Sequence, residues 1–373
     1  MLLLLIVCGG MLPVCLGGCK DSIAYSFRPI YPDAGTGGTG DLDAGVDVLP
    51  PVSCPTTLVG YATLDGGTTG GGDGPVYTAD TLAQLRTYAG MAGAAVVRIN
   101  GTIPLQFDGG QPVELESDKT VLPVHAGDGL IYGGLRIKGT HNVIVRNLTI
   151  AKAPNVNGAD AITIQAANNV WIDHCDLSSD LTSPKGTYDG LVDTVHGSRN
   201  VTVSWNHFHD HYAVSLVGHT DDPTTASIED PPLTVTFHHN YYQRVVQGAP
   251  RARWGHVHLF SNYYQTVQLP SDATSSYAIA STDGATLRIE SNVFEQVAIP
   301  IVTFLDDNSN ITDGTVNDPS ISNFYIPSSS ASANNITTPY NTWKPPYQYV
   351  GSVDSTGGVP IIVRTCAGPG NVP

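Results

Sequence analysis

Three aspartates are spaced so that their carboxylates can meet on one face of a sheet. Asp189 and Asp193 lie in one short segment, and Asp160 precedes them at about the interval of an internal repeat described below. Side chains four residues apart on a strand point to the same side. Because Ca²⁺ prefers carboxylate oxygens, we predict a Ca²⁺ site at these residues. The alternative is that each aspartate caps a turn or faces water.

Two arginines stand in the segment from Gln247 to Gly255. Arg251 and Arg253 alternate with Ala252, so both side chains lie on one side of a strand. An arginine fork binds a carboxylate through two parallel hydrogen bonds, as recognition of a uronic acid requires. The pair therefore predicts a site for an acidic sugar, and the alternative is a solvated sheet edge.

Histidines are concentrated in three places along the same region. They are His207, His209 and His211; His238 and His239; and His256 and His258. A triplet of imidazoles on one face could ligate zinc. We favour the simpler interpretation, in which these histidines are solvent-facing or stacked polar side chains on strands.

The elements that must position these residues are strands of an internal repeat. Six segments alternate along the chain with apolar residues at their second and fourth places. They begin at Asn142, Asn169, Asn200, Thr234, His256 and Thr286. Strands that recur at this interval without helices between them are typical of stacked coils, so we predict an all-β fold, a parallel β-helix.

The repeat carries its own turn residue. In four of the six segments asparagine follows the strand, and the four residues are Asn206, Asn240, Asn262 and Asn292. Asparagine tolerates left-handed backbone and can hydrogen-bond to its copy one coil away. We predict a stacked asparagine ladder at this turn.

Two features flank the repeats. Residues 81–88 show the one clear helical pattern, and a helix there can cap an exposed core. Cys54 and Cys366 stand at the two ends of the folded region, and an exported protein can join them if they meet in space. Cys175 would then be a small buried hydrophobe.

The N-terminus is typical of an export signal. Its first 16 residues are almost wholly apolar but too short to span a bilayer, and they lead into a lipobox-like end at Cys19. We expect a secreted or bacterial cell-surface protein, lipidated at Cys19; the alternative is an ordinary cleaved signal. We assign residues 1–19 to the signal, 20–52 to a Gly/Asp/Pro-rich linker and 53–373 to the folded domain.

The formal net charge of −16 argues against binding to nucleic acid or to an anionic membrane surface. If the substrate is a polyanion, the attraction must be local. A few arginines or bound divalent cations would supply it. We expect a monomer.

Several motifs, in the right order, resemble the pectate lyases of polysaccharide lyase family one. The resemblance covers most of residues 58–351. It is carried by residues 100–103, 133–137 and 142–148 and by Val170-Trp171-Ile172-Asp173-His174, Tyr188-Asp189-Gly190-Leu191-Val192-Asp193 and Phe237-His238-His239-Asn240-Tyr241-Tyr242. It implies a right-handed, single-stranded parallel β-helix that cleaves polygalacturonate by β-elimination with Ca²⁺.

By position, the resemblance implies Asp160, Asp189 and Asp193 as calcium ligands and Arg253 as the second arginine of an Arg-x-Pro-x-x-Arg motif. Two positions depart from the family pattern. The first arginine of the motif, the expected base, falls on Gly248, and a lysine found in many members falls on Ala213. Loss of a positioned general base removes a factor of about 10²–10⁴ in rate.

Three outcomes follow from the two departures. In the first, another residue replaces the base, and the candidates are Arg251, Arg253, Arg244 and His219. In the second, the chain acts on a modified uronan by a related elimination. In the third, it is a non-catalytic, calcium-dependent binder of a uronan. We favour a lyase over a binder. A glycoside hydrolase is a less favoured alternative, because the aspartates are better suited to binding a cation than to serving as the acid and base of hydrolysis.

Overall fold

A computed structural model of the protein describes residues 54–106, 109–156, 158–229, 233–267, 276–303, 313–327 and 333–370. These residues all belong to one compact unit, Pro51–Pro373. The expected export signal, Cys19 and the expected linker lie outside the described residues. Within the described part of the chain, no helix is long and apolar enough to cross a membrane.

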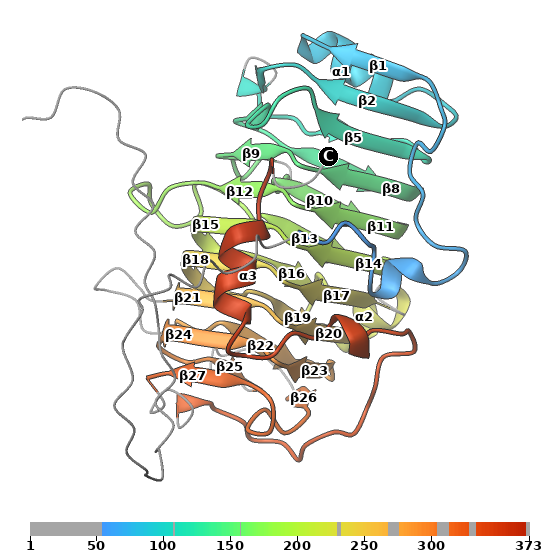
Figure 1. The fold of residues 1–373 in the computed structure, drawn as a ribbon. Coiled ribbons are helices and arrows are strands. Elements are labelled where there is room, and N and C mark those ends of the chain that lie inside the picture. The colour runs from blue at the N-terminus through green and yellow to red at the C-terminus, as the bar shows by residue number, and fades with distance from the viewer. Residues whose placement is uncertain are drawn as a thin grey trace, which may run out of the picture. The chain divides into compact units, whose positions relative to one another are not determined.

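The described residues form a right-handed parallel β-helix, as predicted, in which three sheets run along the stack of coils (Figure 1). From β3 (Thr102–Pro104) onward, each coil gives one strand to each sheet, so neighbours within a sheet are three strands apart in sequence. All strand pairs named in the three sheets are parallel, for example β11 (Asn168–Asp173) with β14 (Arg199–Ser204).

The three sheets contain ten, eight and nine strands. The ten-stranded sheet contains β1 (Val76–Ala79), β2 (Ala95–Ile99), β5 (Lys119–Pro123), β8 (His141–Arg146), β11 (Asn168–Asp173), β14 (Arg199–Ser204), β17 (Thr234–His238), β20 (His256–Phe260), β23 (Thr286–Glu290) and β26 (Thr315–Val316). The eight-stranded sheet contains β4 (Val113–Glu114), β7 (Leu135–Lys138), β10 (Ile162–Gln165), β13 (Val192–Val195), β16 (Leu216–Val217), β19 (Arg251–Arg253), β22 (Ile279–Thr282) and β25 (Ile301–Val302). The nine-stranded sheet contains β3, β6 (Gly129–Ile131), β9 (Thr149–Ala151), β12 (Asp176–Ser178), β15 (His207–Ala213), β18 (Tyr241–Gln247), β21 (Tyr263–Val267), β24 (Val293–Val297) and β27 (Phe324–Ile326).

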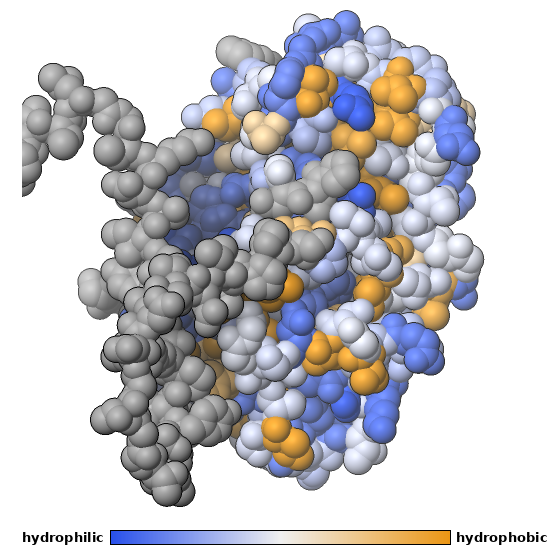
Figure 2. Space-filling view, in the orientation of Figure 1, coloured by the Kyte–Doolittle hydropathy of each residue, from blue (hydrophilic) through white to orange (hydrophobic). Residues whose placement is uncertain are grey.

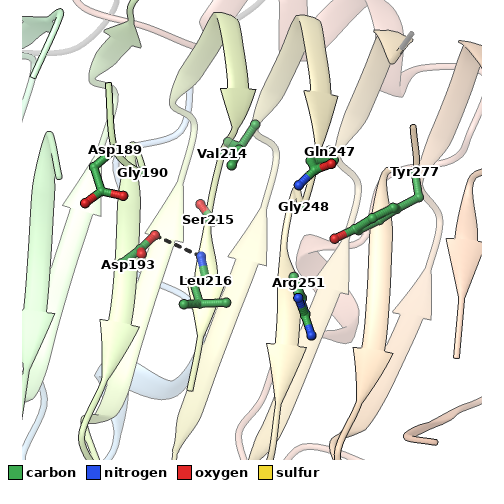
Figure 3. A pocket seen from close by; sticks show the side chains of 11 residues that line it. Asp189, Gly190, Asp193, Val214, Ser215, Leu216, Gln247, Gly248, Arg251 and Tyr277 are labelled. Atoms are coloured by element: carbon green, nitrogen blue, oxygen red, sulfur yellow. Dashed lines mark hydrogen bonds between the residues drawn. The ribbon is translucent and has the colours of Figure 1, made fainter. Parts of the chain in front are cut away.

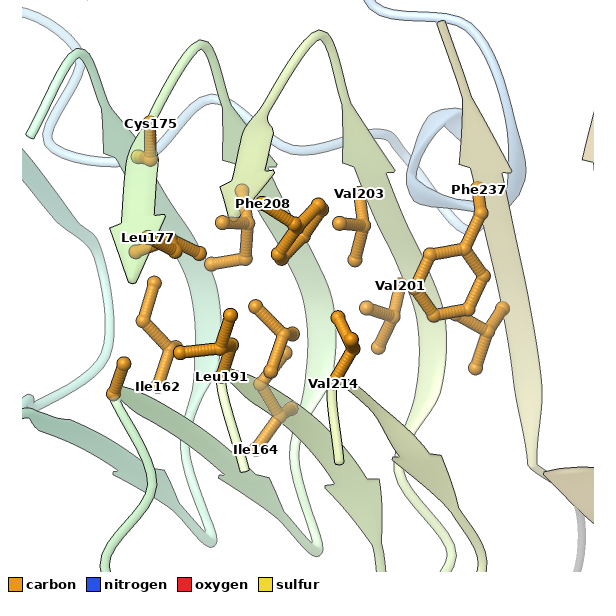
Figure 4. Close-up of a cluster of buried hydrophobic side chains, with 14 of the residues drawn as sticks. Ile162, Ile164, Cys175, Leu177, Leu191, Val201, Val203, Phe208, Val214 and Phe237 are labelled. Atoms are coloured by element: carbon orange, nitrogen blue, oxygen red, sulfur yellow. The ribbon is translucent and has the colours of Figure 1, made fainter. Parts of the chain in front are cut away.

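The six repeat segments recognised in the sequence are β8, β11, β14, β17, β20 and β23, adjacent in that order. Their alternating apolar residues face the interior, since Val143 pairs with Val170 and Val170 with Val201, all fully buried. Figure 4 shows such side chains from successive coils meeting in the core, with Cys175 among them. The prediction of Cys175 as a buried hydrophobe is confirmed.

Aromatic rings also stack inside the helix, one per coil. The stack consists of Phe208, Tyr242, Tyr264, Phe294 and Tyr325, with neighbouring ring centroids 4.6 to 5.3 Å apart. Offset stacking of this kind adds to the free energy gained by burying apolar surface. On the surface shown in Figure 2, hydrophobic residues occur in small groups separated by polar ones.

The asparagine ladder forms as predicted and extends one coil further, to Asn323. The Nδ2 atoms donate in sequence from Asn206 to Asn240, Asn262, Asn292 and Asn323 at 2.9 to 3.1 Å. One detail of the prediction is wrong. The left-handed residue of each turn is the one before the asparagine, for example His239 at φ 54°.

We expect Asn240→Ala to lower the free energy of unfolding by about 2–4 kcal/mol. Asn240 is fully buried, and its Oδ1 accepts from both the backbone N–H and the Nδ2 of Asn206 at 3.0 Å. Alanine would leave those donors buried without an acceptor. Urea denaturation measures the loss, with the exposed Asn155→Ala as the control. Equal midpoints for the two variants would show that the ladder contributes nothing to stability.

The predicted helix is α1 (Leu82–Ala89). The Thr81 hydroxyl oxygen caps the helix by accepting from the backbone N–H of Gln84. The side-chain oxygen of Gln84 accepts from the backbone N–H of Asp80, and this arrangement is typical of a helix start. The helix buries Leu85 and Ala89 against the first strands, at the end of the stack (Figure 1). It therefore caps the exposed end of the core.

The chain ends are tied to the middle of the stack. After Cys54, the short helix η1 (Tyr61–Thr63) lies on the ten-stranded sheet, where the N–H of Tyr61 donates to Thr236 Oγ1 at 3.1 Å. Further short helices in the described part of the chain are α2 (Pro223–Glu229), η4 (Val350–Ser352) and α3 (Val359–Cys366), and α3 packs on Tyr241 and Tyr263. Cys366 at the end of α3 forms a disulfide with Cys54 across 312 residues of sequence.

Candidate active site

The three predicted calcium ligands lie together on the outside of the eight-stranded sheet. Asp160 precedes β10 and is buried, and it accepts from the Thr163 hydroxyl at 2.7 Å and from the Gly190 N–H at 2.9 Å. Asp193 on β13 accepts from the N–H of Leu216 at 2.9 Å, and Asp189 precedes the same strand (Figure 3). Thr163 was missed by sequence reasoning, although it stands three residues after Asp160.

Gly190 lets two of these carboxylates approach each other. A Cβ atom at this position would lie 2.5 Å from Oδ1 of Asp193 and 2.8 Å from Oδ1 of Asp160, closer than van der Waals contact allows. Both oxygens therefore face the same small space, and a larger residue at position 190 would displace the carboxylates.

Burial and mutual repulsion disfavour the charged forms of these groups. Burial and the nearby Asp189 raise the pKa of Asp160 to about 7. Burial, then Asp160, raises the pKa of Asp193 well above its usual value, although Asp193 is partly open to solvent. The pKa of Asp189 is raised by burial as well. An all-carboxylate donor set with uncompensated charge fits a hard divalent cation such as Ca²⁺.

The two predicted arginines lie on the same sheet face, two strands from Asp193. Arg251 pairs in register with Leu216, which places it roughly 10 Å from Asp193 at a strand spacing of about 4.8 Å. Asp221 contacts both arginines, with its Oδ1 3.4 Å from Nη2 of Arg251 and 2.5 Å from Nε of Arg253. Burial, then the neighbouring Arg251, lowers the pKa of Arg253.

A hollow of about 190 Å³ lies between the aspartates and Arg251 (Figure 3). Its wall includes Ala213, Ser215, Gln247, Gly248 and Tyr277. A Cβ atom at Gly248 would meet nothing closer than 3.5 Å, so the hollow has room for a side chain there. Sequence reasoning missed Tyr277 and Ser215, because no motif marks them and only the stacking of coils brings them to this wall.

The family model described as pectate lyase matches residues 47–371. The chain belongs to the pectate lyase family. Pectate lyase A of Aspergillus niger is 42% identical over 63% of this chain and 68% of its own length, and pectate lyase plyB of Emericella nidulans is 40% identical over 58% and 63%. The chain thus matches under two thirds of plyB.

A bacterial relative and a solved structure match over more of their length. Pectate trisaccharide-lyase of Bacillus licheniformis is 31% identical over 85% of this chain and 87% of its own. A pectate lyase of a Bacillus species, solved in complex with trigalacturonate, superposes with a TM-score of 0.70 at 26% identity, covering 84% of this chain and 99% of that one. These matches agree with the right-handed β-helix described above.

Both departures from the pectate lyase pattern, Gly248 and Ala213, line the hollow. The space left by the two shorter residues is therefore continuous. Of the candidates for a replacement base, only Arg251 lines it. Arg244 lies on the nine-stranded sheet, paired with Asp210 at 2.6 Å, and His219 stacks on His196 with ring centroids 3.8 Å apart.

The histidines are not a same-face triplet. Asp210 has φ 51°, which breaks the strand alternation of β15 and turns His211 inward, where it is 2% exposed. The zinc alternative for His207, His209 and His211 is therefore wrong. His238 is buried and stacks on Phe260, as the favoured interpretation predicts, and the buried His258 contacts the same ring at a tilt of 31°.

Proposed function

We propose that this protein is a calcium-dependent lyase that cleaves polygalacturonate, or a related acidic plant polysaccharide, by β-elimination. The observation that carries the proposal is a hollow lined by Asp189, Asp193 and Arg251, with Asp160 beside the two aspartates and Arg253 beside the arginine on the same sheet face. Relatives with 31–42% identity are named as pectate lyases, and the trigalacturonate complex of a structural neighbour supports the same substrate class.

Asp160, Asp189 and Asp193 would hold the Ca²⁺, with the remaining oxygens of its shell coming from water and substrate. When bound, Ca²⁺ neutralises a uronate carboxylate and so makes the proton on C5 more acidic. Arg253 positions a uronate carboxylate. Asp221 forms an ion pair with the Arg253 guanidinium, its Oδ1 lying 2.5 Å from Nε.

We assign the base to Arg251, because it is the arginine that lines the hollow. The C5–H bond breaks and its proton passes to the base. The electron pair forms the C4–C5 double bond, and the C4–O4 bond breaks. The O4 of the departing chain then takes up a proton. The guanidine must be neutral to accept the proton, which requires a site that disfavours its charge.

A second candidate function is calcium-dependent binding of a uronan without cleavage. The observation that favours it is the hollow itself, where Gly248 and Ala213 supply neither a base nor a carboxylate-binding amine. Binding needs affinity for the acidic chain but no proton transfer. The aspartates and arginines serve both functions.

Ultraviolet absorbance of unsaturated uronide on polygalacturonate tests the proposal. With Ca²⁺ we expect absorbing product, and with a chelator we expect none. Product that persists in chelator would contradict the calcium requirement. Retention on polygalacturonate in Ca²⁺ without product would support the binding function, and new reducing ends without ultraviolet absorbance would point to hydrolysis.

We also propose that the protein is exported and works as a monomer. The apolar N-terminus and the disulfide between Cys54 and Cys366 support an oxidising compartment. Lipidation at Cys19 would hold the domain at a bacterial cell surface. Labelling with a radioactive fatty acid, with Cys19→Ser as the control, distinguishes the lipoprotein from a released enzyme.

A further inference from the structure

We propose that Asp176, His207 and His209 form a second metal site, which binds a divalent transition-metal cation such as Zn²⁺. Among the described residues, this is the group of three His, Cys, Asp or Glu side chains that brings its ligand atoms within 4.8 Å of one another. It lies on the nine-stranded sheet, apart from the aspartates on the eight-stranded sheet.

Stacking of coils creates the group. Asp176 on β12 pairs in register with His207 on the neighbouring β15, and His209 lies two residues further on the same face. Nδ1 of His207 is 3.1 Å from one carboxylate oxygen of Asp176, and Nε2 of His209 is 3.1 Å from the other. Ligands of a tetrahedral Zn²⁺ with bonds of about 2.0–2.1 Å lie roughly 3.4 Å apart, so small shifts admit the ion.

The surroundings orient His209 as a metal ligand. Its Nδ1 lies 2.7 Å from Asp210, and Arg244 holds Asp210 through two bonds of 2.6 Å. A carboxylate behind the distal nitrogen is the usual support of a metal-bound histidine, because it fixes the ring and its tautomer. Nε2 of His209 and Oδ1 of Asp176 lie 3.1 Å apart and share a hydrogen bond, and a bound cation would take the place of that proton between them.

Accessibility and ligand chemistry agree with a metal site. The side chains of Asp176, His207 and His209 are 21 to 23% exposed, so an ion can enter and a water can complete the shell. Nε2 of His207 is buried without a hydrogen-bond partner, as expected if Nδ1 carries the interaction. Two imidazoles and one carboxylate suit Zn²⁺ better than Ca²⁺, which takes oxygen ligands.

Calorimetric titration of the metal-stripped protein with ZnCl₂, in excess Ca²⁺ and without substrate, tests the proposal. We expect one equivalent of Zn²⁺ to bind to the wild type and to His125→Ala, a variant of an exposed histidine. His209→Ala and Asp176→Asn should each weaken binding at least about 100-fold. Asp210→Asn should weaken it about 10–100-fold.

Co²⁺ gives a second readout. Bound at this site it should show the intense visible absorption of a four-coordinate ion, absent in His209→Ala. Circular dichroism confirms that each variant is folded, and His207→Gln replaces any that is not. No Zn²⁺ binding by the wild type, or unchanged binding in both His209→Ala and Asp176→Asn, would overturn the proposal. In that case a proton shared by the imidazoles and Asp176 accounts for the geometry.

Discussion

Replacing Gly248 with arginine should raise the rate of polygalacturonate cleavage, by up to about 10²–10⁴-fold to the extent that Arg251 is a poor substitute for a base at this position. The hollow beside Gly248 has room for the side chain, since a Cβ atom meets nothing closer than 3.5 Å. The new guanidinium would occupy the space between Arg251 and the aspartates. Initial rates of ultraviolet absorbance in saturating Ca²⁺ measure the gain.

The backbone at Gly248 has φ +65°, so any side chain there costs about 1–2 kcal/mol. Gly248→Gln has a long polar side chain at the same backbone cost but no base, which makes it the matched control. Its rate should not exceed that of the wild type. If Gly248→Arg is folded but no faster than the wild type, the absence of an arginine at position 248 does not limit the rate, and this prediction is wrong.

Replacing Asp193 with asparagine should abolish calcium-dependent activity and yet stabilise the calcium-free protein. Asparagine keeps an oxygen for the N–H of Leu216 but removes a ligand charge. Loss of several kcal/mol of transition-state stabilisation corresponds to a rate loss of roughly 10²-fold or more. In chelator the same change relieves the repulsion with Asp160, so the free energy of unfolding at pH 8 should rise by about 1 kcal/mol or more.

The pH dependence of stability tests independently whether the charged aspartates destabilise the calcium-free protein. Burial and Asp189 raise the pKa of folded Asp160 to about 7, against about 3.9 in the unfolded chain. Between these values the folded state binds a proton that the unfolded state lacks, so stability in chelator falls as pH rises from about 4 to 7. Thermal melts in chelator should show this fall, and Ca²⁺ or Asp193→Asn should reduce it. A melting temperature independent of pH would contradict the assignment.

The repeating features of the fold could be predicted from the sequence because they are periodic. Alternation at Val143, Val170 and Val201 fixes which side of each strand faces the core, and equal residues at equal places in the coil must stack. The asparagine ladder follows from the same logic. The left-handed residue of each turn could not be predicted in this way, because different residue types occupy that position, such as Trp205 and Ser261.

Part of the candidate site could be predicted from the sequence for the same reason. Asp160, Asp189 and Asp193 stand at related places in successive coils, so their convergence could be expected. Asp176 could have been found too, because the 31-residue separation in sequence that joins Asn169 to Asn200 also joins Asp176 to His207.

Irregular positions could not be predicted. The inward turn of His211 depends on the backbone of one residue, Asp210, which breaks the alternation on which the reasoning rests. The hollow depends on how closely Tyr277 approaches Gly248, which lies in the connection between β18 and β19 (Figure 3). Such distances are set by tertiary packing rather than by periodicity.

The disulfide between Cys54 and Cys366 determines how mechanical load passes through the molecule. The segment after Cys54 lies on the middle of the ten-stranded sheet, and α3 packs on β18 and β21, so the bond joins two parts already attached to central coils. Tension applied at the N-terminus therefore enters the stack at its middle. The terminal coils, including the one capped by α1, lie outside this path.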